Sequence, residues 1–189
     1  EVVYEICRAL GVMDGEIAKL LYLAISTDTG CFVYSNTTSD THRIAGELMQ
    51  EDFDCFAINK RHFRTKSHAR MRLEAAVIAG MELYDNGRIA VLTLPLSLMA
   101  EIGATEADAD DISSLANLLE GVDCGMVIKE LPSGEWKISL RTGARLNAST
   151  ICSKYGGGGH AAAAGCTLSG TAAEARDAML AAVAEVANG

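Results

Sequence analysis

"CGMVIKELPSGEWKISLRT", residues 124 to 142, decides the fold class of this chain. Two strand-like runs flank Pro132-Ser133-Gly134, a turn sequence, so we expect them to pair as a β-hairpin. The second run alternates apolar and polar residues, which predicts one buried face and one polar face. The buried positions are Trp136, Ile138 and Leu140, and the polar positions are Lys137, Ser139 and Arg141.

The segments around this hairpin mix strands and helices. "RIAVLTL", residues 88 to 94, is apolar on both faces and reads as a buried strand. Residues 107 to 122 predict an acid-capped helix, with four inward residues: Ile112, Leu115, Leu118 and Leu119. A short helix at 148 to 154, a last strand in "GCTLSG" and a final helix capped by Thr171 and Glu174 follow.

The first part of the chain has a helical pattern. Helices are expected from residue 1, at 15 to 25 after Asp14, and in "SDTHRIAGELMQ", where Ile44 and Leu48 face inward. Two further apolar faces are Val2, Val3, Ile6 and Leu10 in the first helix, and Ile17, Leu20, Leu21 and Ala24 in the second. The chain begins directly in a helical pattern, without methionine or a leader, so we expect it to be part of a longer protein.

Composition limits the class of protein. The chain of 189 residues is 49% hydrophobic and 22% charged, with two prolines, as in a packed globular protein. No apolar run reaches the roughly 18 residues that a membrane span needs, so we expect no membrane partner and a cytoplasmic location. The six cysteines form no CxxC pair, which favours buried reduced thiols. A formal net charge of −9 opposes a large polyanion, so a bound nucleic acid should be short or held by a few groups.

Four consecutive glycines, Gly156, Gly157, Gly158 and Gly159, precede His160. Without Cβ atoms, such a run can turn several amides toward one anion, with His160 and Arg141 as nearby donors. A flexible hinge with a surface histidine is the alternative, and glycine content alone does not separate the two. The run lacks serine and lies within one small domain, which favours the anion seat. No Lys-Ser/Thr pair follows, so it is not a P-loop.

Asp28 in "TDTG" is the second candidate site. A carboxylate after an apolar segment can serve as a metal ligand, but taken alone the motif favours an Asx-turn or a capping role. An aspartic-protease site requires two such aspartates in an all-β protein, and this sequence has a single Asp-Thr-Gly, so that class of enzyme is a poor fit. The basic stretch 60 to 72 is expected to be the solvated face of a linker helix, and His42, His62 and His68 have no metal-binding partner at i+4.

"ISTDTGCFVYSNTT" and "SLRTGARLNASTICSKYGGGGHAAAAG", in this order, resemble the DHH phosphoesterase family. The similarity is to its branch of nano-RNases and 3′-phosphoadenosine 5′-phosphate phosphatases, and it extends over nearly the whole chain. The resemblance implies an α/β (mixed α+β) fold in three parts. These are a C-terminal remnant of the catalytic domain at 1–60, a helical linker at 61–86, and a smaller substrate-binding domain with a mixed sheet at 87–189.

The resemblance also implies roles for individual residues. Asp28 matches a ligand of a two-manganese (Mn2+) centre, and Arg141, the glycine run and His160 match the surface that holds a terminal phosphate. The implied activity is that of a hydrolase acting on a short single-stranded oligonucleotide or a nucleotide phosphate. A homodimer is included among the expected partners.

This chain departs from the family pattern. Neither an Asp-x-Asp motif near a first strand nor an Asp-His-His triplet occurs in it, and Val33 and Ala161 stand where relatives often have cations. We therefore expect the chain alone to bind nucleotide phosphates weakly and to hydrolyse little. The alternative is a nucleic-acid-binding or tRNA-editing-associated module without metal hydrolysis. The motif "TDTGCF" argues against it, because this part of the chain resembles the catalytic domain of the phosphoesterases and not a synthetase segment. A polyphosphatase or pyrophosphatase ranks lower, because those relatives generally lack the GGGGH motif.

Overall fold

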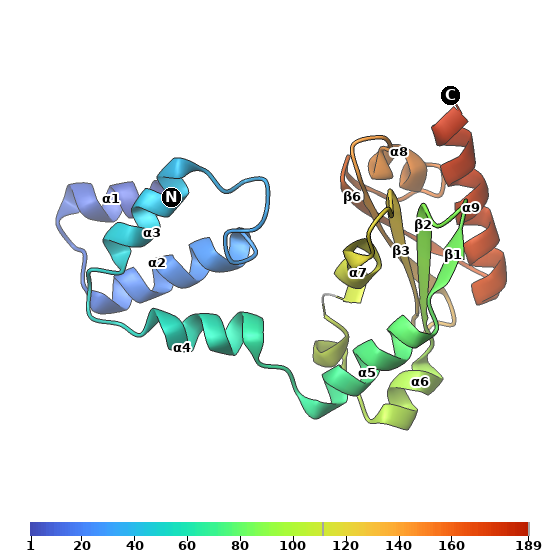
Figure 1. The fold of residues 1–189 in the computed structure, drawn as a ribbon, viewed down its shortest axis with the longest axis horizontal. Coiled ribbons are helices and arrows are strands. Elements are labelled where there is room, and N and C mark those ends of the chain that lie inside the picture. Colours follow the sequence, from blue (N-terminus) through green and yellow to red (C-terminus); the bar gives the residue numbers. More distant parts are fainter. Residues whose placement is uncertain (111, 189) are drawn as a thin grey trace. The chain divides into compact units, whose positions relative to one another are not determined.

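The computed structural model describes residues 1–110 and 112–188, which divide into two compact units (Figure 1). The first unit is Glu1–Lys66 and the second is Ser67–Gly189. The division falls inside the segment 61–86, for which the sequence predicts a linker. The assignment of the first unit to a catalytic-domain remnant stays a prediction.

The first unit is helical. Its elements are α1 (Val2–Leu10), α2 (Gly15–Asp28), α3 (Ser39–Leu48), α4 (Cys55–Asn59) and the π-helical turn η1 (Lys60–Arg64). Three of the helices begin at side chains that accept a hydrogen bond from a first-turn amide: Asp14, Thr38 and Asp54. These caps satisfy amides that the helix itself leaves free, which explains where the helices start.

The core of the first unit differs from the predicted one. The prediction is confirmed for Ile44 and Leu48, which are buried. It is wrong for the apolar face of α1 and for Leu20 of α2, since Val2, Leu10 and Leu20 are 75%, 69% and 60% exposed. Leu21 of α2 does pack against the core. The buried residues of these helices and of α3 are Tyr4, Ala18, Tyr22, Ile25, Ile44, Ala45 and Leu48.

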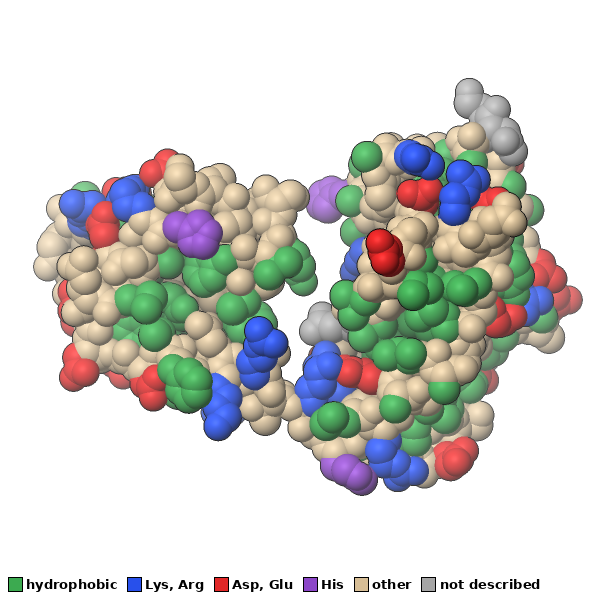
Figure 2. Space-filling model, in the orientation of Figure 1, with side chains coloured by type: hydrophobic (Ala, Val, Ile, Leu, Met, Phe, Trp, Pro, Cys, Tyr) green, Lys and Arg blue, Asp and Glu red, His purple; other side chains and the backbone are tan. Residues whose placement is uncertain are grey.

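Aromatic residues explain this difference. The rings of Tyr4 and Tyr22 fill the space between the helices, and their hydroxyls reach Glu47 and Asn59 respectively. A tyrosine that keeps its hydroxyl paired can be buried as deeply as an aliphatic residue. Hydrophobic side chains therefore remain visible on the surface of this unit (Figure 2).

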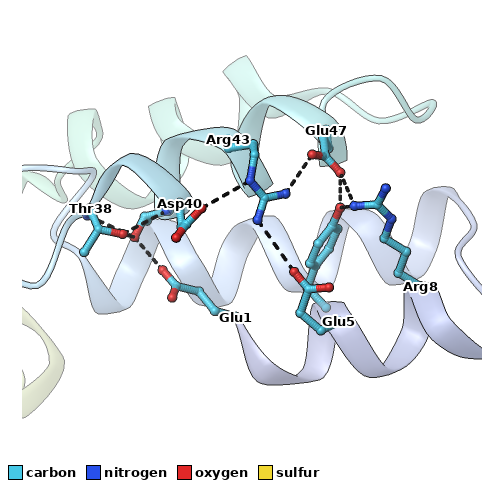
Figure 3. A network of polar contacts seen from close by, with 9 residues as sticks. Glu1, Glu5, Arg8, Thr38, Asp40, Arg43 and Glu47 are labelled. Carbon is cyan, nitrogen blue, oxygen red and sulfur yellow. Dashed lines mark hydrogen bonds and ion pairs between the residues drawn. The ribbon is translucent and has the colours of Figure 1, made fainter.

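A polar network joins α1 to α3 (Figure 3). Arg43 contacts Asp40 at 3.3 Å and Glu47 at 2.8 Å, and Arg8 contacts Glu47 at 3.1 Å. The hydrogen bond from the Tyr4 hydroxyl, followed by that from Arg43, lowers the pKa of Glu47. The network stabilises the carboxylate form of Glu47 and so couples the packing of the two helices to pH.

The second unit has a six-stranded mixed sheet in its described residues. Its helices are α5 (His68–Ala79), α6 (Leu96–Ile102), α7 (Ile112–Leu115), α8 (Ala148–Ser153) and α9 (Ala172–Asn188), with 3₁₀ turns η2 (Glu106–Ala109) and η3 (Ala116–Leu118). Its strands are β1 (Glu82–Tyr84), β2 (Ile89–Leu94), β3 (Cys124–Glu130), β4 (Trp136–Thr142), β5 (Gly158–His160) and β6 (Ala163–Leu168). The order is β1-β2-β3-β4-β6-β5, with β2 and β3 parallel and the other pairs antiparallel. The predicted mixed α/β fold is confirmed.

Helices cover both faces of this sheet. On one face, α8 and α9 pack against the buried positions of the hairpin, including Trp136, Ile138 and Leu140, as predicted. On the other face, residues of α5, α6 and α7 pack against β2 and β3. Leu73 and Val77 of α5 are fully buried there, so this helix is part of the second unit.

Two features of the second unit were not expected. The helix predicted at 107 to 122 is divided into η2, α7 and η3, and Leu118 is 77% exposed while Ala116 is buried. Leu119 leaves the last turn in an extended conformation, which ends the helical pattern. The glycine run also forms part of the sheet, as β5.

Candidate functional site

One half of a sheet face in the second unit carries polar and small residues. We call this surface the open face: Lys137, Ser139 and Arg141 of β4, Ala163, Gly165 and Thr167 of β6, and Gly158 and His160 of β5. The register places Arg141 opposite Ala163, and Ala163 opposite His160. Paired residues project from the same face, and strands lie about 4.8 Å apart, so the Cα atoms of Arg141 and His160 are about 10 Å apart. Small side chains separate the two donors.

Arg141 is held without a carboxylate partner among the described residues. Its guanidinium donates to the hydroxyl of Ser113 at 3.1 Å and to the carbonyl of Leu140 at 3.2 Å. Both acceptors are neutral, and a guanidinium has five N–H donors. The positive charge and several donors therefore remain for a ligand anion at the border of the open face.

The glycine run is ordered by close packing on β6. A Cβ at Gly157 would lie 2.2 Å from the Gly165 carbonyl oxygen and 2.5 Å from the Cβ of Cys166. At Gly158, by contrast, a Cβ would meet nothing within 4 Å. Gly156 has φ 71°, a left-handed conformation that ends α8 and favours glycine. The run is therefore a fixed part of the sheet edge and not slack chain.

The amides of this run are not all available for an anion. The amide of Gly156 donates to the Ser153 carbonyl and that of Gly157 to the Cys152 carbonyl, both at 3.1 Å. These bonds satisfy carbonyls at the end of α8. The expectation that several amides of the run turn toward one anion is thus corrected for Gly156 and Gly157, whose amides close α8. The run also lets a ligand approach the backbone closely, because no side chain covers it.

A buried threonine fixes the turn that follows His160. The Thr142 hydroxyl donates to the carbonyls of Ala161 at 2.9 Å and Leu146 at 3.1 Å, and its amide donates to Ala162 at 3.0 Å. The amide of Ala148 also donates to the Ala161 carbonyl, at 2.8 Å. Because Thr142 follows Arg141 directly, the two candidate donors Arg141 and His160 are anchored to the same end of β4.

A hollow of about 460 Å³ adjoins the glycine run. Its lining includes Lys137, Tyr155, Gly156, Gly157, Gly158, Gly165, Cys166 and Thr167. Hydrogen bonding with the Cys152 thiol, together with burial, raises the pKa of Cys166, and burial raises the pKa of Cys124 to about 12. Cys166 lines the hollow, and its raised pKa favours the neutral thiol there.

Asp28 lies in the first unit, at the end of α2. Its carboxylate and its carbonyl both accept from the Asn36 side-chain amide at 3.2 Å. Buried Thr29 organises the following loop, since its hydroxyl donates to Ile25 at 2.7 Å and accepts from the Phe32 amide at 3.1 Å. Gly30, Cys31 and Phe32 have φ between 55° and 67°, so this loop holds three successive left-handed residues.

A dinuclear metal centre is not assembled within the described part of the chain. No three His, Cys, Asp or Glu side chains come together there in a way that could hold a metal ion. Asp28 therefore supplies a carboxylate without further ligands of these types. A two-manganese site needs several such oxygen or nitrogen donors, so the residues present here do not fit one.

Three residues at or near the site are not marked by the sequence: Ser113, Asn117 and Thr142. Asn117 lies near it, because its Oδ1 would be 1.9 Å from a Cβ at Gly125, the β3 residue paired with Arg141. Alternation along β4 was a signal for Lys137 and Ser139. No local pattern marks Ser113 or Asn117, since they reach the strand only through the packing of α7 and η3.

Comparisons with known proteins agree with this architecture. The DHHA1 domain family matches residues 86–189. The bifunctional oligoribonuclease and PAP phosphatase NrnA of Thermus thermophilus is 33% identical over 172 residues, 90% of this chain and 51% of that protein. A probable enzyme of the same name from Streptococcus mutans is 30% identical over 153 residues, 81% of this chain and 48% of that protein. This chain spans about half the length of these curated relatives.

A solved structure shares the fold. The crystal structure of an exopolyphosphatase-related protein from Bacteroides fragilis aligns with a TM-score of 0.91 at 24% identity. The match covers 99% of this chain and 56% of that one. Among the helices that the structure describes, none has the length and apolar character needed to cross a membrane.

Proposed function

Because this chain belongs to the DHHA1 domain family, we propose that its open face binds the terminal phosphate of a small nucleic-acid ligand. The proposed ligand is a short single-stranded oligoribonucleotide or 3′-phosphoadenosine 5′-phosphate (PAP). The relatives are named as oligoribonucleases and phosphatases, which are hydrolases. In this proposal the open face holds the substrate for a phosphoesterase, and the chain supplies binding and not turnover.

The observation that carries the proposal is the fixed position and unneutralised charge of the Arg141 guanidinium. Its guanidinium is positioned by Ser113 and a backbone carbonyl, and no carboxylate in the described residues neutralises it. Across the small Ala163, His160 presents a second donor from the same face. A phosphate over Ala163 would accept charge-assisted hydrogen bonds from the guanidinium and meet no large side chain.

The glycine run sets how closely the substrate approaches. Gly158 and Gly165 are paired on the open face and carry no side chain, so a sugar-phosphate group can lie against the backbone. Arg141 and His160 then bind and orient the terminal phosphate, and the next ester is left facing away from the sheet. These steps require only groups of this chain.

Asp28 is proposed as one ligand of a manganese centre in the intact hydrolase. Such a centre would supply metal-activated water for phosphoester hydrolysis, with Asp28 as one of its carboxylate ligands. The described residues do not assemble it, so we assign substrate binding and little or no hydrolysis to this chain. A homodimer and a cytoplasmic location stay predictions.

Binding to PAP tests the role of the open face. Isothermal titration calorimetry should detect weak binding by the wild type, and Arg141→Gln should reduce the affinity by about 10- to 100-fold, the range for a charged hydrogen bond. Arg145→Gln is the matched control, because Arg145 is exposed and pairs with Asp123 at 3.4 Å. The control should stay within about twofold of wild type. Absence of PAP binding by the wild type, or equal losses in both variants, would contradict the proposal.

Turnover tests the division of roles. With Mn2+ and a dinucleotide, this chain should bind the substrate without releasing mononucleotides. Robust hydrolysis would overturn the assignment. The alternative is a nucleic-acid-binding or tRNA-editing-associated module without metal hydrolysis. Tight binding to a tRNA acceptor stem, with no binding to PAP, would select that alternative.

A further inference from the structure

The cations without a carboxylate partner are gathered in two places. Most Lys and Arg side chains lie in ion pairs: Arg8, Lys19, Arg43, Arg70, Arg88, Lys129, Arg145, Lys154 and Arg176. Within residues 1–110 and 112–188, those without such a pair are Lys60, Arg61, Arg64, Arg72, Lys137 and Arg141. Two belong to the open face. The other four come from one short stretch of an acidic chain.

Three of these four cations lie on the first unit. We call the surface formed by Phe56, Lys60, Arg61, His62 and Arg64 the basic patch. All five residues are exposed, and Phe56 is 69% exposed, which is unusual for a phenylalanine. The Lys60 ammonium lies 5.9 Å from the centre of the Phe56 ring. Figure 2 shows Lys and Arg side chains at the end of α4 (Figure 1).

The local charge opposes that of the whole chain. Residues 55 to 73 contain six Lys or Arg and no Asp or Glu, whereas the formal net charge of the chain is −9. Lys60, Arg61 and Arg64 have no carboxylate partner among the described residues, and their mutual repulsion costs stability unless a ligand neutralises them. In addition, η1 is a π-helical turn, a rare element that is frequent at functional sites.

A hollow of about 500 Å³ lies beside Arg61 and His62. Its apolar lining includes Leu20, Leu23, Phe53 and Ile58. Glu16, Asp52 and Asp54 also line it, so an anionic group would be repelled inside. The hollow suits an uncharged base or ribose, and the adjoining cations suit the phosphates.

We propose that the basic patch binds the backbone of single-stranded RNA, as a second binding surface in addition to the open face. The inference rests on the proposed function, in which oligoribonucleotides are the ligands. Cations that follow a phosphate backbone, next to an exposed aromatic ring on which a base stacks, form the usual surface for single strands. A membrane is a poorer fit, because α4 has five residues and too little apolar face to enter a lipid interface.

The test uses fluorescence anisotropy with a labelled single-stranded 12-mer RNA, and calorimetry with PAP. The patch variant is Lys60→Gln, Arg61→Gln, Arg64→Gln. Its matched control is Arg8→Gln, Arg88→Gln, Arg145→Gln, which removes the same charge from ion-paired positions. For single strands, each phosphate contact contributes about 0.7 to the slope of log binding constant against log salt concentration. Loss of three contacts should therefore reduce this slope by about 2, and the affinity for the 12-mer at 0.1 M salt by up to about 100-fold. Phe56→Ala should weaken 12-mer binding by about 10-fold.

The outcomes separate this inference from the proposed function. Loss of 12-mer binding in the patch variant, with PAP affinity unchanged and the control near wild type, supports the patch. An unchanged 12-mer affinity and salt slope in the patch variant overturns it, even if PAP still binds the open face. Equal losses in the control, or binding of the wild type to phosphatidylserine vesicles but not to RNA, also overturn it. If the wild type binds the 12-mer through the patch but not PAP, the patch stands and the open-face proposal fails.

Discussion

Alanine substitutions at the adjacent glycines Gly157 and Gly158 should differ in their effect on stability, because only Gly157 lacks room for a side chain. At Gly157 a Cβ would lie 2.2 Å from the Gly165 carbonyl oxygen and 2.5 Å from Cys166, so the strand must move by about 1 Å. Overpacking of this kind costs about 2–3 kcal/mol. At about 4 °C per kcal/mol for a unit of this size, Gly157→Ala should lower Tm by about 10 °C.

Gly158→Ala is the matched variant. Nothing lies within 4 Å of its Cβ and its φ is not in the left-handed region, so Tm should change by less than about 2 °C. The new methyl group would instead occupy the open face beside Gly165, and PAP affinity should fall several-fold. One substitution removes stability and its neighbour removes binding.

Tryptophan fluorescence during thermal unfolding measures this effect in the correct unit. The chain has a single tryptophan, and Trp136 is buried in the core that also contains Cys166. Its indole donates to the Gly170 carbonyl at 3.1 Å, so its emission reports the second unit. Equal Tm values for the two variants would refute the argument that the glycine run is packed in place.

Three further predictions concern other contacts. Thr142→Val removes the single hydroxyl donor that the carbonyls of Leu146 and Ala161 share, which should cost roughly 1–2 kcal/mol and lower the Tm of the second unit by about 5 °C. An unchanged Tm would argue against this anchor. The pKa of Glu47 is lowered in the folded chain, so its stabilisation is present above about pH 4.3 and is lost as the pH falls toward the lowered value. Acid titration by circular dichroism at 222 nm should therefore show a smaller loss of helix stability in Glu47→Gln than in the wild type, and identical curves would contradict the network's role. Burial raises the pKa of Cys124 to about 12, so this thiol and the other two buried ones, Cys152 and Cys166, should resist Ellman's reagent. Native protein should therefore release three or fewer equivalents of thionitrobenzoate quickly.

The sheet was predictable where side chains alternate. Residues 124 to 142 gave the hairpin and its buried face because an antiparallel strand with one packed side requires this pattern. β5 was not predictable, since glycines carry no hydrophobic signal. Its pairing depends on the space left above Cys166, a property of the assembled sheet.

The cores show a second limit of pattern reading. Aliphatic spacing in α1 indicated Val2 and Leu10 as buried, but Tyr4 occupies the interface because α3 offers Glu47 to its hydroxyl. Similarly, Leu118 in η3 is exposed although it fits a helical stripe. A periodic pattern identifies an apolar side without showing which neighbour covers it.

The candidate site was predictable in its residues more than in its geometry. Arg141 and His160 were chosen from the sequence, and the register of three strands brings them to one face. The hydrogen bonds of the Gly156 and Gly157 amides were not foreseeable, because they depend on where α8 ends. The position of Asp28 relative to further metal ligands likewise depends on long-range folding.

The place of β5 in the sheet has a consequence for its dynamics. This three-residue strand pairs with β6, and breaking that pairing leaves the ladders from β1 to β4 intact. Amide protons of Gly158–His160 should therefore exchange with solvent much faster than those of central β3. A bound nucleotide that rests on this strand would slow their exchange selectively, which makes the glycine segment a built-in reporter of occupancy.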